Sequence, residues 1–315
     1  MSKISKALER AKQERGMVGG DVPPQDGTVA APPGKGISCY VPGEDSASGD
    51  EFSESDVFTP SLYDTGNSCI LPPPFGRIVS DGKEAYGVFS HLTAEALEQR
   101  KVLLEKHRIM TFLPERRYID HYNYLRTQVL QRTRAKGWNT LMVTSVNRGE
   151  GKTLTAINLA LSLSREARQT AMIVDANLRY PAVAKYLGLA ENALGLSDYL
   201  FNNLDVGDLI INPRLGNMIR VMLAGKPLIE SSDILSLPKV TNLVKELKNR
   251  YPERYVIFDC PHLKHMPDAL LFSSYVDGII LVAEAGKTTR EDLKETLKNL
   301  RHSNIVGLVL NKFNE

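Results

Sequence analysis

The sequence lacks the features that mark secreted, membrane-spanning and cluster-binding proteins. Its three cysteines, Cys39, Cys69 and Cys260, are far apart and include no C-x-x-C pair, which argues against a disulfide framework and against a cysteine-held metal site. No apolar run approaches the roughly 20 residues that cross a bilayer, and the first residues show no signal-peptide core. A reducing, cytoplasmic environment is therefore expected.

A strong charge of either sign is also missing. The chain has 39 Lys and Arg residues against 37 Asp and Glu residues, a formal net charge of +2. Because the charges balance, the chain has no overall excess of positive charge that would attract nucleic acid or an anionic membrane. We therefore expect no nucleic-acid partner. With 315 residues, the chain can still bury a substantial core in one or two domains.

Three regions differ in composition. Residues 1–16 place a narrow stripe of apolar side chains at helical spacing among basic ones. This pattern predicts a short amphipathic helix that either docks on a partner or membrane surface or frays without packing. Residues 17–90 are acidic and rich in Pro, Gly and Ser. They predict a disordered linker, because such a segment cannot bury enough apolar area to offset its chain entropy. Residues 91–315 are expected to form the folded domain, beginning with a helix over 92–106.

The folded region alternates short Val- and Ile-rich runs with amphipathic helical patterns. Strands that are apolar throughout are typical of a parallel sheet buried on both faces. The expected fold class is α/β, with a mostly parallel sheet flanked by helices, and ligands of such sheets bind at the carboxyl ends of the strands. We expect strands at 140–144, 170–174, 218–223, 254–258, 278–283 and 306–310, and helices at 153–165, 237–250, 268–274 and 289–302.

A glycine-rich stretch, Ser145–Thr153, joins the first of these strands to the helix that follows it. Gly149 and Gly151 let backbone amides converge on phosphate oxygens without a Cβ in the way. Lys152 can reach the outer phosphates of a nucleotide, and the Thr153 hydroxyl can ligate Mg²⁺. This pattern predicts a phosphate-binding loop of the P-loop NTPase type. The expected nucleotide contacts are Gly149, Glu150, Gly151, Lys152, Thr153 and Leu154.

An acidic residue closes each of two later strands. Asp175 follows Ala171–Val174, and Asp259 follows Tyr255–Phe258. A lone acid in such a position is most simply a helix cap, but two acids downstream of a glycine-rich loop fit a bound Mg²⁺-nucleotide, which gives buried carboxylates a partner. The predicted metal ligands are Thr153, Asp175 and Asp259, and the predicted catalytic residues are Lys152, Asp175 and Asp259.

Three motifs, in this order, resemble the bacterial tyrosine kinase (BY-kinase) family. They are Ser-x-x-x-Gly-Glu-Gly-Lys-Thr at 145–153, Ile-Val-Asp-Ala-Asn-Leu-Arg-Tyr-Pro at 173–181 and Val-Ile-Phe-Asp-Cys-Pro at 256–261. Later segments agree, so the resemblance covers about 108–315. Val146 replaces the first Gly of the common G-x-x-x-x-G-K-[ST] loop, a Gly that this family also lacks. The start of the chain, Met-Ser-Lys-Ile-Ser-Lys-Ala-Leu, is similar to free-standing kinases of exopolysaccharide and exosortase-linked loci.

The resemblance implies a P-loop ATPase related to the MinD/ParA group, with ATP and Mg²⁺ as cofactors. It implies a partner, a membrane chain-length-determinant (polysaccharide co-polymerase) protein, and a role in exopolysaccharide assembly with recruitment to the inner face of the membrane. Lys152 would hold phosphates, Asp175 would open the second Walker-type motif, and Asp259 would be the Walker B acid. Asn311, expected just after the last strand, would contact the adenine edge, or it is a plain turn residue. Arg179 would anchor the second-motif loop or form a surface salt bridge.

Several positions depart from the family's pattern. Asn177 replaces the second acid of Asp-x-Asp-x-Arg, and an amide cannot accept a proton as a carboxylate does. The family's terminal tyrosine cluster has no counterpart, because the last tyrosine is Tyr275, expected in a helix. Asn123 replaces the middle Arg of the subunit-contact motif, here Asp120–Arg126, which leaves self-association open. We therefore expect ATP binding with reduced autokinase activity.

Two further substitutions lie beside the phosphate site. Arg148 stands where the family's loop usually has Pro, and His262 replaces a second Pro after Cys260 and Pro261. His262 could sense phosphate, although a solvated loop histidine is the simpler interpretation.

Other functional classes remain as alternatives. A non-catalytic scaffold of the same assembly would use ATP only to order the loops around Asn177 and after Asp259. A DNA- or cargo-partitioning ATPase would need a basic patch and a loop lysine, but Val146 and Asn147 occupy the start of the loop. A nitrogenase-like reductase would need a cysteine pair for its cluster.

Overall fold

The computed structural model describes residues 36–40, 77–80, 83–86, 94–202, 204–215 and 219–313. They all belong to one of the two compact units of the chain, the unit made of 24–41 and 75–315. The helix predicted over 1–16 lies outside the described residues. Among the described helices, none combines the length and the hydropathy of a membrane span.

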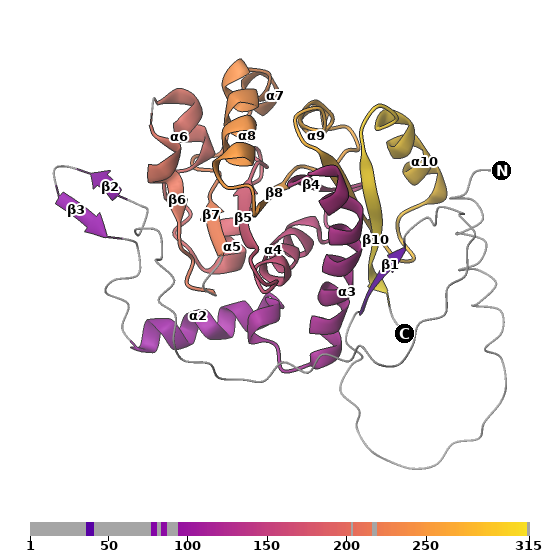
Figure 1. Ribbon diagram of the computed structural model, residues 1–315, viewed down its shortest axis with the longest axis horizontal. Helices are drawn as coiled ribbons and strands as arrows, with labels where there is room; N and C mark the ends of the chain where they lie inside the picture. The colour runs from indigo at the N-terminus through magenta and orange to yellow at the C-terminus, as the bar shows by residue number, and fades with distance from the viewer. Residues whose placement is uncertain are drawn as a thin grey trace, which may run out of the picture. The chain divides into compact units, whose positions relative to one another are not determined.

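An eight-stranded sheet organises this unit, in the order β1-β10-β9-β4-β8-β5-β7-β6 (Figure 1). The strands from β10 to β7 run parallel, and β1 and β6 pair antiparallel at the two edges. This topology confirms the α/β fold class. The strands of the sheet are β1 (Gly36–Tyr40), β4 (Thr140–Ser145), β5 (Thr170–Asp175), β6 (Ile210–Ile211), β7 (Ile219–Met222), β8 (Arg254–Asp259), β9 (Gly278–Glu284) and β10 (Ile305–Phe313).

The central strands are buried on both faces, as their apolar sequences predict. Every residue of β4 is buried, and so is every residue of β5 and β8 after the first. The helices that cover the sheet or lie at its ends are α2 (Ala94–Lys106), α3 (Arg116–Thr133), α4 (Lys152–Leu163), α5 (Val183–Leu187), α6 (Leu196–Phe201), α7 (Ser231–Leu235), α8 (Pro238–Arg250), α9 (Pro267–Phe272) and α10 (Arg290–Asn299). Short 3₁₀ turns are η1 (Met110–Phe112), η2 (Arg134–Lys136) and η3 (Val206–Leu209).

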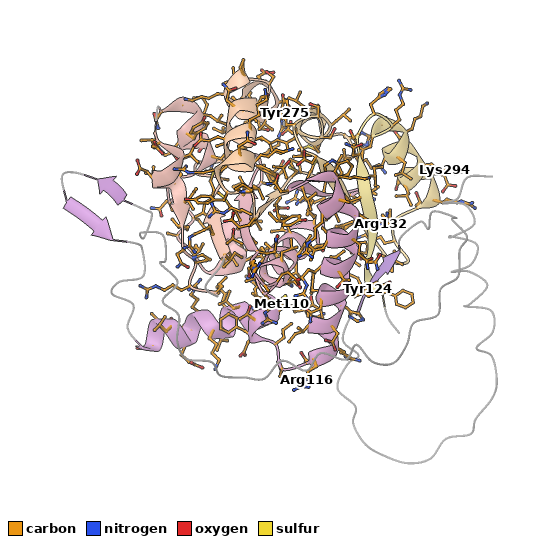
Figure 2. The ribbon with its side chains drawn as sticks, viewed as in Figure 1. Met110, Arg116, Tyr124, Arg132, Tyr275 and Lys294 are labelled. Atoms are coloured by element: carbon orange, nitrogen blue, oxygen red, sulfur yellow. The ribbon has the colours of Figure 1, made fainter. Side chains whose placement is uncertain are left out.

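Chain direction across the sheet sets which face each helix covers. α4 leads from β4 outward to β5, whereas α8 leads from β7 back toward β8, so right-handed crossovers place α4 and α8 on opposite faces. α3 packs on α4, and the main core lies between these helices and the sheet. Figure 2 labels one of its residues, Met110 of η1, which is buried and whose amide donates to Asn158 Oδ1 of α4 at 2.9 Å.

Several sequence-based expectations differ from the structure. The range 17–90, predicted as a disordered linker, contains β1 and a two-stranded hairpin of β2 (Arg77–Ser80) and β3 (Lys83–Tyr86); most of the range lies outside the described residues. Helix α3 was not among the predicted helices. Tyr275, expected in a helix, lies in the turn after α9, where its hydroxyl donates to the Leu235 carbonyl at 3.2 Å (Figure 2).

Candidate phosphate-binding site

The glycine-rich loop between β4 and α4 takes a shape that only glycine adopts at low cost. Gly149 and Gly151 have φ values of 87° and 96°, in the left-handed region that a side chain disfavours. Gly151 is also the residue from which α4 starts. A Cβ there would lie 2.0 Å from Nδ2 of Asn311, so the loop and β10 are in close contact at this point.

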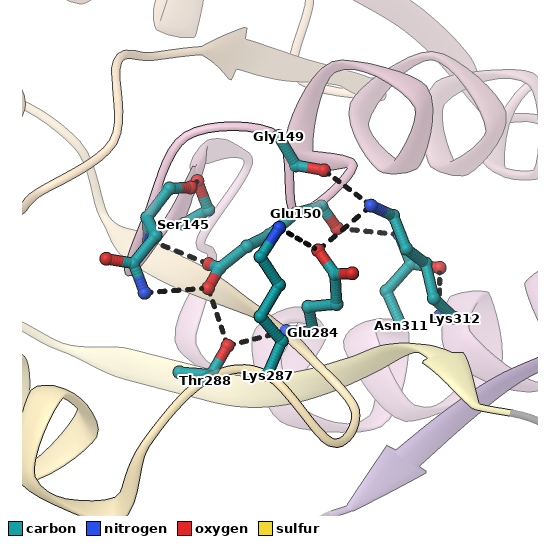
Figure 3. A network of polar contacts seen from close by, with 9 residues as sticks. Ser145, Gly149, Glu150, Glu284, Lys287, Thr288, Asn311 and Lys312 are labelled. Atoms are coloured by element: carbon teal, nitrogen blue, oxygen red, sulfur yellow. Dashed lines mark hydrogen bonds and ion pairs between the residues drawn. The ribbon is translucent and has the colours of Figure 1, made fainter.

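Glu150 fixes the loop from inside. Its side chain is buried, with 1% of its surface exposed. Its Oε2 accepts from the Asn147 amide at 2.8 Å, and its Oε1 accepts from Asn147 Nδ2 at 3.1 Å and from Thr288 Oγ1 at 2.5 Å (Figure 3). The Glu150 carboxylate is thus occupied by protein donors and ties the loop to the turn between β9 and α10.

Two residues of β10 hold the loop from the other side. Nδ2 of Asn311 donates to the Glu150 carbonyl at 2.7 Å, and Nζ of Lys312 donates to the Gly149 carbonyl at 2.8 Å (Figure 3). Lys312 also pairs with Glu284 at 2.9 Å, which helps to hold the pKa of that carboxyl below its ordinary value against its burial. We call the Asn311 and Lys312 contacts with the loop the β10 brace.

The placement of Asn311 corrects the sequence-based expectation. The residue lies within β10, not after it, and is 7% exposed. Its Oδ1 accepts from the Lys312 amide at 2.9 Å while its Nδ2 bonds the loop. Both polar atoms of the side chain therefore have partners within the protein, so contact with an adenine edge stays a prediction that would require these bonds to rearrange.

Thr153 and Asp259 meet beneath the loop. The Thr153 hydroxyl donates to Asp259 Oδ2 at 2.7 Å, and Lys152 Nζ lies 3.5 Å from the same hydroxyl. Asp259 is fully buried, and its Oδ1 has no hydrogen-bond partner among the described residues. Burial raises the pKa of Asp259, whereas Lys152 and the Thr153 hydroxyl lower it.

Asp175 lies beside Asp259 on the neighbouring strand and is opposite it in the sheet register. Its Oδ2 accepts from the Ala182 and Val183 amides at 2.9 and 3.0 Å, and its Oδ1 accepts from the Asn177 amide at 3.2 Å. Burial, followed by the charge of Asp259, raises the pKa of Asp175 to about 7. Asp175 therefore orders the start of α5 in addition to facing the second acid.

These groups fit a Mg²⁺-nucleotide better than a metal held by protein alone. The described residues contain no cluster of three or more His, Cys, Asp or Glu side chains that could hold a metal ion. Mg²⁺ is usually bound by one or two carboxylates together with substrate phosphates. The unpartnered Oδ1 of Asp259 and the hydroxyl of Thr153 supply oxygen ligands of that kind, and a cation here would relieve the repulsion between the two acids.

The chain is similar to known tyrosine-protein kinases. Tyrosine-protein kinase CpsD of Streptococcus agalactiae is 29% identical over 198 residues, which cover 62% of this chain and 84% of that protein. The solved kinase domain of Escherichia coli tyrosine kinase ETK superposes with a TM-score of 0.58 at 25% identity, covering 62% of this chain and 75% of that one. The succinoglycan biosynthesis transport protein ExoP of Rhizobium meliloti (strain 1021) is 23% identical over 229 residues, 69% of this chain and 28% of that protein. No protein-family model matches the chain.

These similarities support a BY-kinase-like P-loop ATPase. In this chain, the side chain of Asn177 is hydrogen-bonded within the second motif itself. Asn177 Nδ2 donates to the Tyr180 carbonyl at 2.7 Å, and its Oδ1 accepts from the Tyr180 amide at 3.4 Å. A carboxylate could not donate the first of these bonds, so Asn177 stabilises a loop conformation that the family's acid would not. The Tyr180 ring in turn stacks with Arg148 of the phosphate loop, 4.9 Å from the ring centre.

Arg179 joins the second motif to two helices. Its guanidinium lies 3.8 Å from the fully buried Asp268 of α9 and 3.4 Å from the Ser231 hydroxyl of α7. Ser231 and Ser232 also donate short hydrogen bonds to Asp268. The buried partner favours an anchoring role for Arg179 over a surface salt bridge.

The structure brings most of the predicted site residues together. The loop residues, Lys152, Thr153, Asp175 and Asp259 share the carboxyl edge of the sheet, while the partly buried Leu154 side chain packs against the core. Sequence reasoning missed Thr288 and Lys312. Thr288 belongs to no motif and Lys312 only ends a segment that resembles the family's last strand, and their contacts with the loop span 138 and 163 residues.

Proposed function

We propose that the protein is a Mg-ATP-binding, BY-kinase-like ATPase that regulates exopolysaccharide chain length or export together with a membrane chain-length-determinant protein. Nucleotide binding is supported above all by the hydrogen bond of 2.7 Å between Thr153 and Asp259, which lies beneath the loop whose glycines have a left-handed backbone. Oδ1 of Asp259 is buried and has no hydrogen-bond partner among the described residues. A buried carboxylate oxygen without a donor is costly, and a cation carried in with the nucleotide would satisfy it.

Each residue then has a defined task. The loop amides and Lys152 would hold the phosphates, and Thr153 and Asp259 would hold Mg²⁺, directly or through its waters. When bound, Mg²⁺ would neutralise charge on the phosphate oxygens during phosphoryl transfer. Asp175 would help to orient the second motif through its hydrogen bonds to the start of α5, and Glu150 would hold the phosphate loop in its conformation.

Support for the polysaccharide part comes from the relatives. ExoP is named as a succinoglycan biosynthesis transport protein, and the chain matches 28% of its length. We infer that this chain performs the corresponding cytoplasmic step and reaches the inner face of the membrane through a separate partner protein. Self-association belongs to the same proposal.

Reduced autokinase output is supported by the second motif. Asn177 offers no carboxylate, and its amide is engaged by the Tyr180 backbone. The side chain of Asp175 already accepts three backbone amides. A general base for an incoming hydroxyl would therefore have to come from another group or from the partner protein.

Lys152→Ala tests the nucleotide part. The variant is expected to lose measurable ATP binding by isothermal titration calorimetry, because the loop's cationic contact with the outer phosphates is gone. Lys287→Ala is the matched control: its ammonium group is more exposed and pairs with Glu284, so ATP affinity should stay near that of the wild type. Unchanged ATP affinity in Lys152→Ala would refute the proposal.

The alternative is a non-catalytic, nucleotide-gated scaffold of the same assembly, favoured by the closed conformation at Asn177. Asn177→Asp separates the two. The carboxylate would face the Tyr180 carbonyl and is expected to turn away from it, toward the nucleotide. A clear gain of phosphotyrosine, measured by mass spectrometry with Mg-ATP and the partner's cytosolic tail, supports the kinase; no gain, with polysaccharide output intact, supports the scaffold.

A further inference from the structure

His262 lies on the loop that leads from β8 to α9, and the backbone holds this loop against the phosphate loop. The amide of Leu263 donates to the Ser145 carbonyl at 2.9 Å, and the amide of Lys264 donates to the Val146 carbonyl at 3.2 Å. These bonds continue the contact of this chain segment with β4 beyond the end of β8. His262 is therefore placed beside the start of the phosphate loop by backbone geometry and not by its own side chain.

The side chain of His262 is half-buried in a group of cations. The groups that act on it electrostatically are Lys152 of α4, Arg148 of the phosphate loop and His265 of its own loop. Burial first, then these positive charges, hold the pKa of His262 below its ordinary value. Within the described part of the chain, no hydrogen bond or ion pair engages the His262 ring.

The remaining charges nearby are already paired. Lys264 is paired with Asp292 of α10 at 2.8 Å. Asp259 accepts from Thr153 and acts electrostatically on Lys152, but no carboxylate is among the groups that act on the His262 ring. The ring therefore lacks an anionic partner, and the neighbouring Lys152 indicates which anion would fit, because the lysine of a phosphate loop reaches the outer phosphates of a nucleotide.

We propose that the His262 imidazole binds the terminal phosphate of bound ATP and takes up one proton from solvent as it does so. The inference rests on the proposed function, since the ligand is the same Mg-ATP. The phosphates reverse the local field from positive to negative, so the protonated ring, which donates a charge-assisted hydrogen bond, becomes the favoured form. Arg148 and Lys152 bind the same terminal phosphate. The His262 ring adds a further contact to that phosphate, which an inner phosphate cannot make.

Proton uptake is measured by titrating ATP into the full-length protein with Mg²⁺ at pH 7 in two buffers of different ionisation enthalpy. The wild type is expected to take up nearly one proton with ATP and clearly less with ADP. Because one proton is linked to binding, ATP affinity should rise by up to about tenfold for each unit by which pH falls, between the pKa of the free ring and that of the bound ring. The His262 ring signals in proton NMR should shift their titration to higher pH when ATP binds.

His262→Gln keeps a hydrogen-bond donor but cannot titrate, so it should lose the proton uptake and most of the pH dependence. His302→Gln, at an exposed histidine after α10 that does not act on the His262 ring, should keep both. Equal uptake in the wild type and in His262→Gln, or equal uptake for ATP and ADP, would overturn the assignment. Failure of the wild type to bind ATP at all would instead overturn the proposed function. ATP binding that requires Lys152, with no uptake linked to His262, would overturn this inference alone.

Discussion

Gly149 and Gly151 offer a matched pair of substitutions that tests the β10 brace. Both residues have a left-handed backbone, with φ values of 87° and 96°. Their surroundings differ. A Cβ on Gly149 would meet no atom within 4 Å, whereas a Cβ on Gly151 would lie 2.0 Å from Nδ2 of Asn311. Alanine at 149 therefore adds backbone strain alone, and alanine at 151 adds the same strain and displaces the brace.

The expected magnitudes follow from these two effects. A left-handed backbone costs an L-residue about 1–2 kcal/mol, which is the expected loss in free energy of unfolding for Gly149→Ala. In Gly151→Ala the Asn311 amide must also leave the Glu150 carbonyl, and a buried polar group without its partner costs about 1–3 kcal/mol. Gly151→Ala should therefore cost about 1–3 kcal/mol more than Gly149→Ala.

The measurement is urea unfolding followed by circular dichroism, for both glycine variants in the wild type and in an Asn311→Ala background. Removing the Asn311 side chain removes the clash, so the difference between the two glycine variants should shrink to near zero there. Equal destabilisation of the two variants in the wild type would refute the brace. So would a difference that persists without the Asn311 amide, since the strain at 151 would then have another cause.

Two further perturbations test other contacts of the site. Thr288→Val removes the donor to the buried Glu150 carboxylate and should lower stability by about 1–3 kcal/mol and weaken ATP binding, whereas Thr127→Val, at an exposed helix position, should do neither. Burial and Asp259 raise the pKa of Asp175 to about 7, so the folded protein holds a proton that the unfolded chain releases above about pH 4. The free energy of unfolding without nucleotide should fall as pH rises from about 4 to about 7. Asp259→Asn should flatten this slope in urea titrations; equal slopes in the two proteins would contradict the coupling of the two acids.

The sequence predicts the place of a site residue best where that residue lies at the end of a predicted strand. Asp175 and Asp259 were predictable because parallel strands end at one edge, and the register that pairs them follows from that rule. The sequence predicts Asn311 after the last strand, but the residue lies within β10. The reason is that the apolar run stops at Leu310, whereas the backbone pairing continues to Phe313. The pairing of β1 with β10 has no local signal at all, since it depends on an edge formed by residues about 270 positions later in the chain.

In this chain, the groups that could bind Mg-ATP differ from the groups that phosphoryl transfer would need. Among the groups at the carboxyl edge, Asp175 is engaged by α5 and Asn177 by Tyr180, which leaves Asp259 as the acid with an oxygen that no protein donor satisfies. That oxygen is suited to a metal and not to a proton from an acceptor hydroxyl, because the metal it would bind keeps it ionised. If the proposed function holds, a site with Asp259 available to the metal, and with Asn177 in place of the second acid, would bind Mg-ATP without turning it over efficiently. We therefore expect different substitutions to change nucleotide affinity and phosphotyrosine yield. Substitution of Lys152 or of the β10 brace should change the affinity for the nucleotide, and substitution of Asn177 should change the yield of phosphotyrosine.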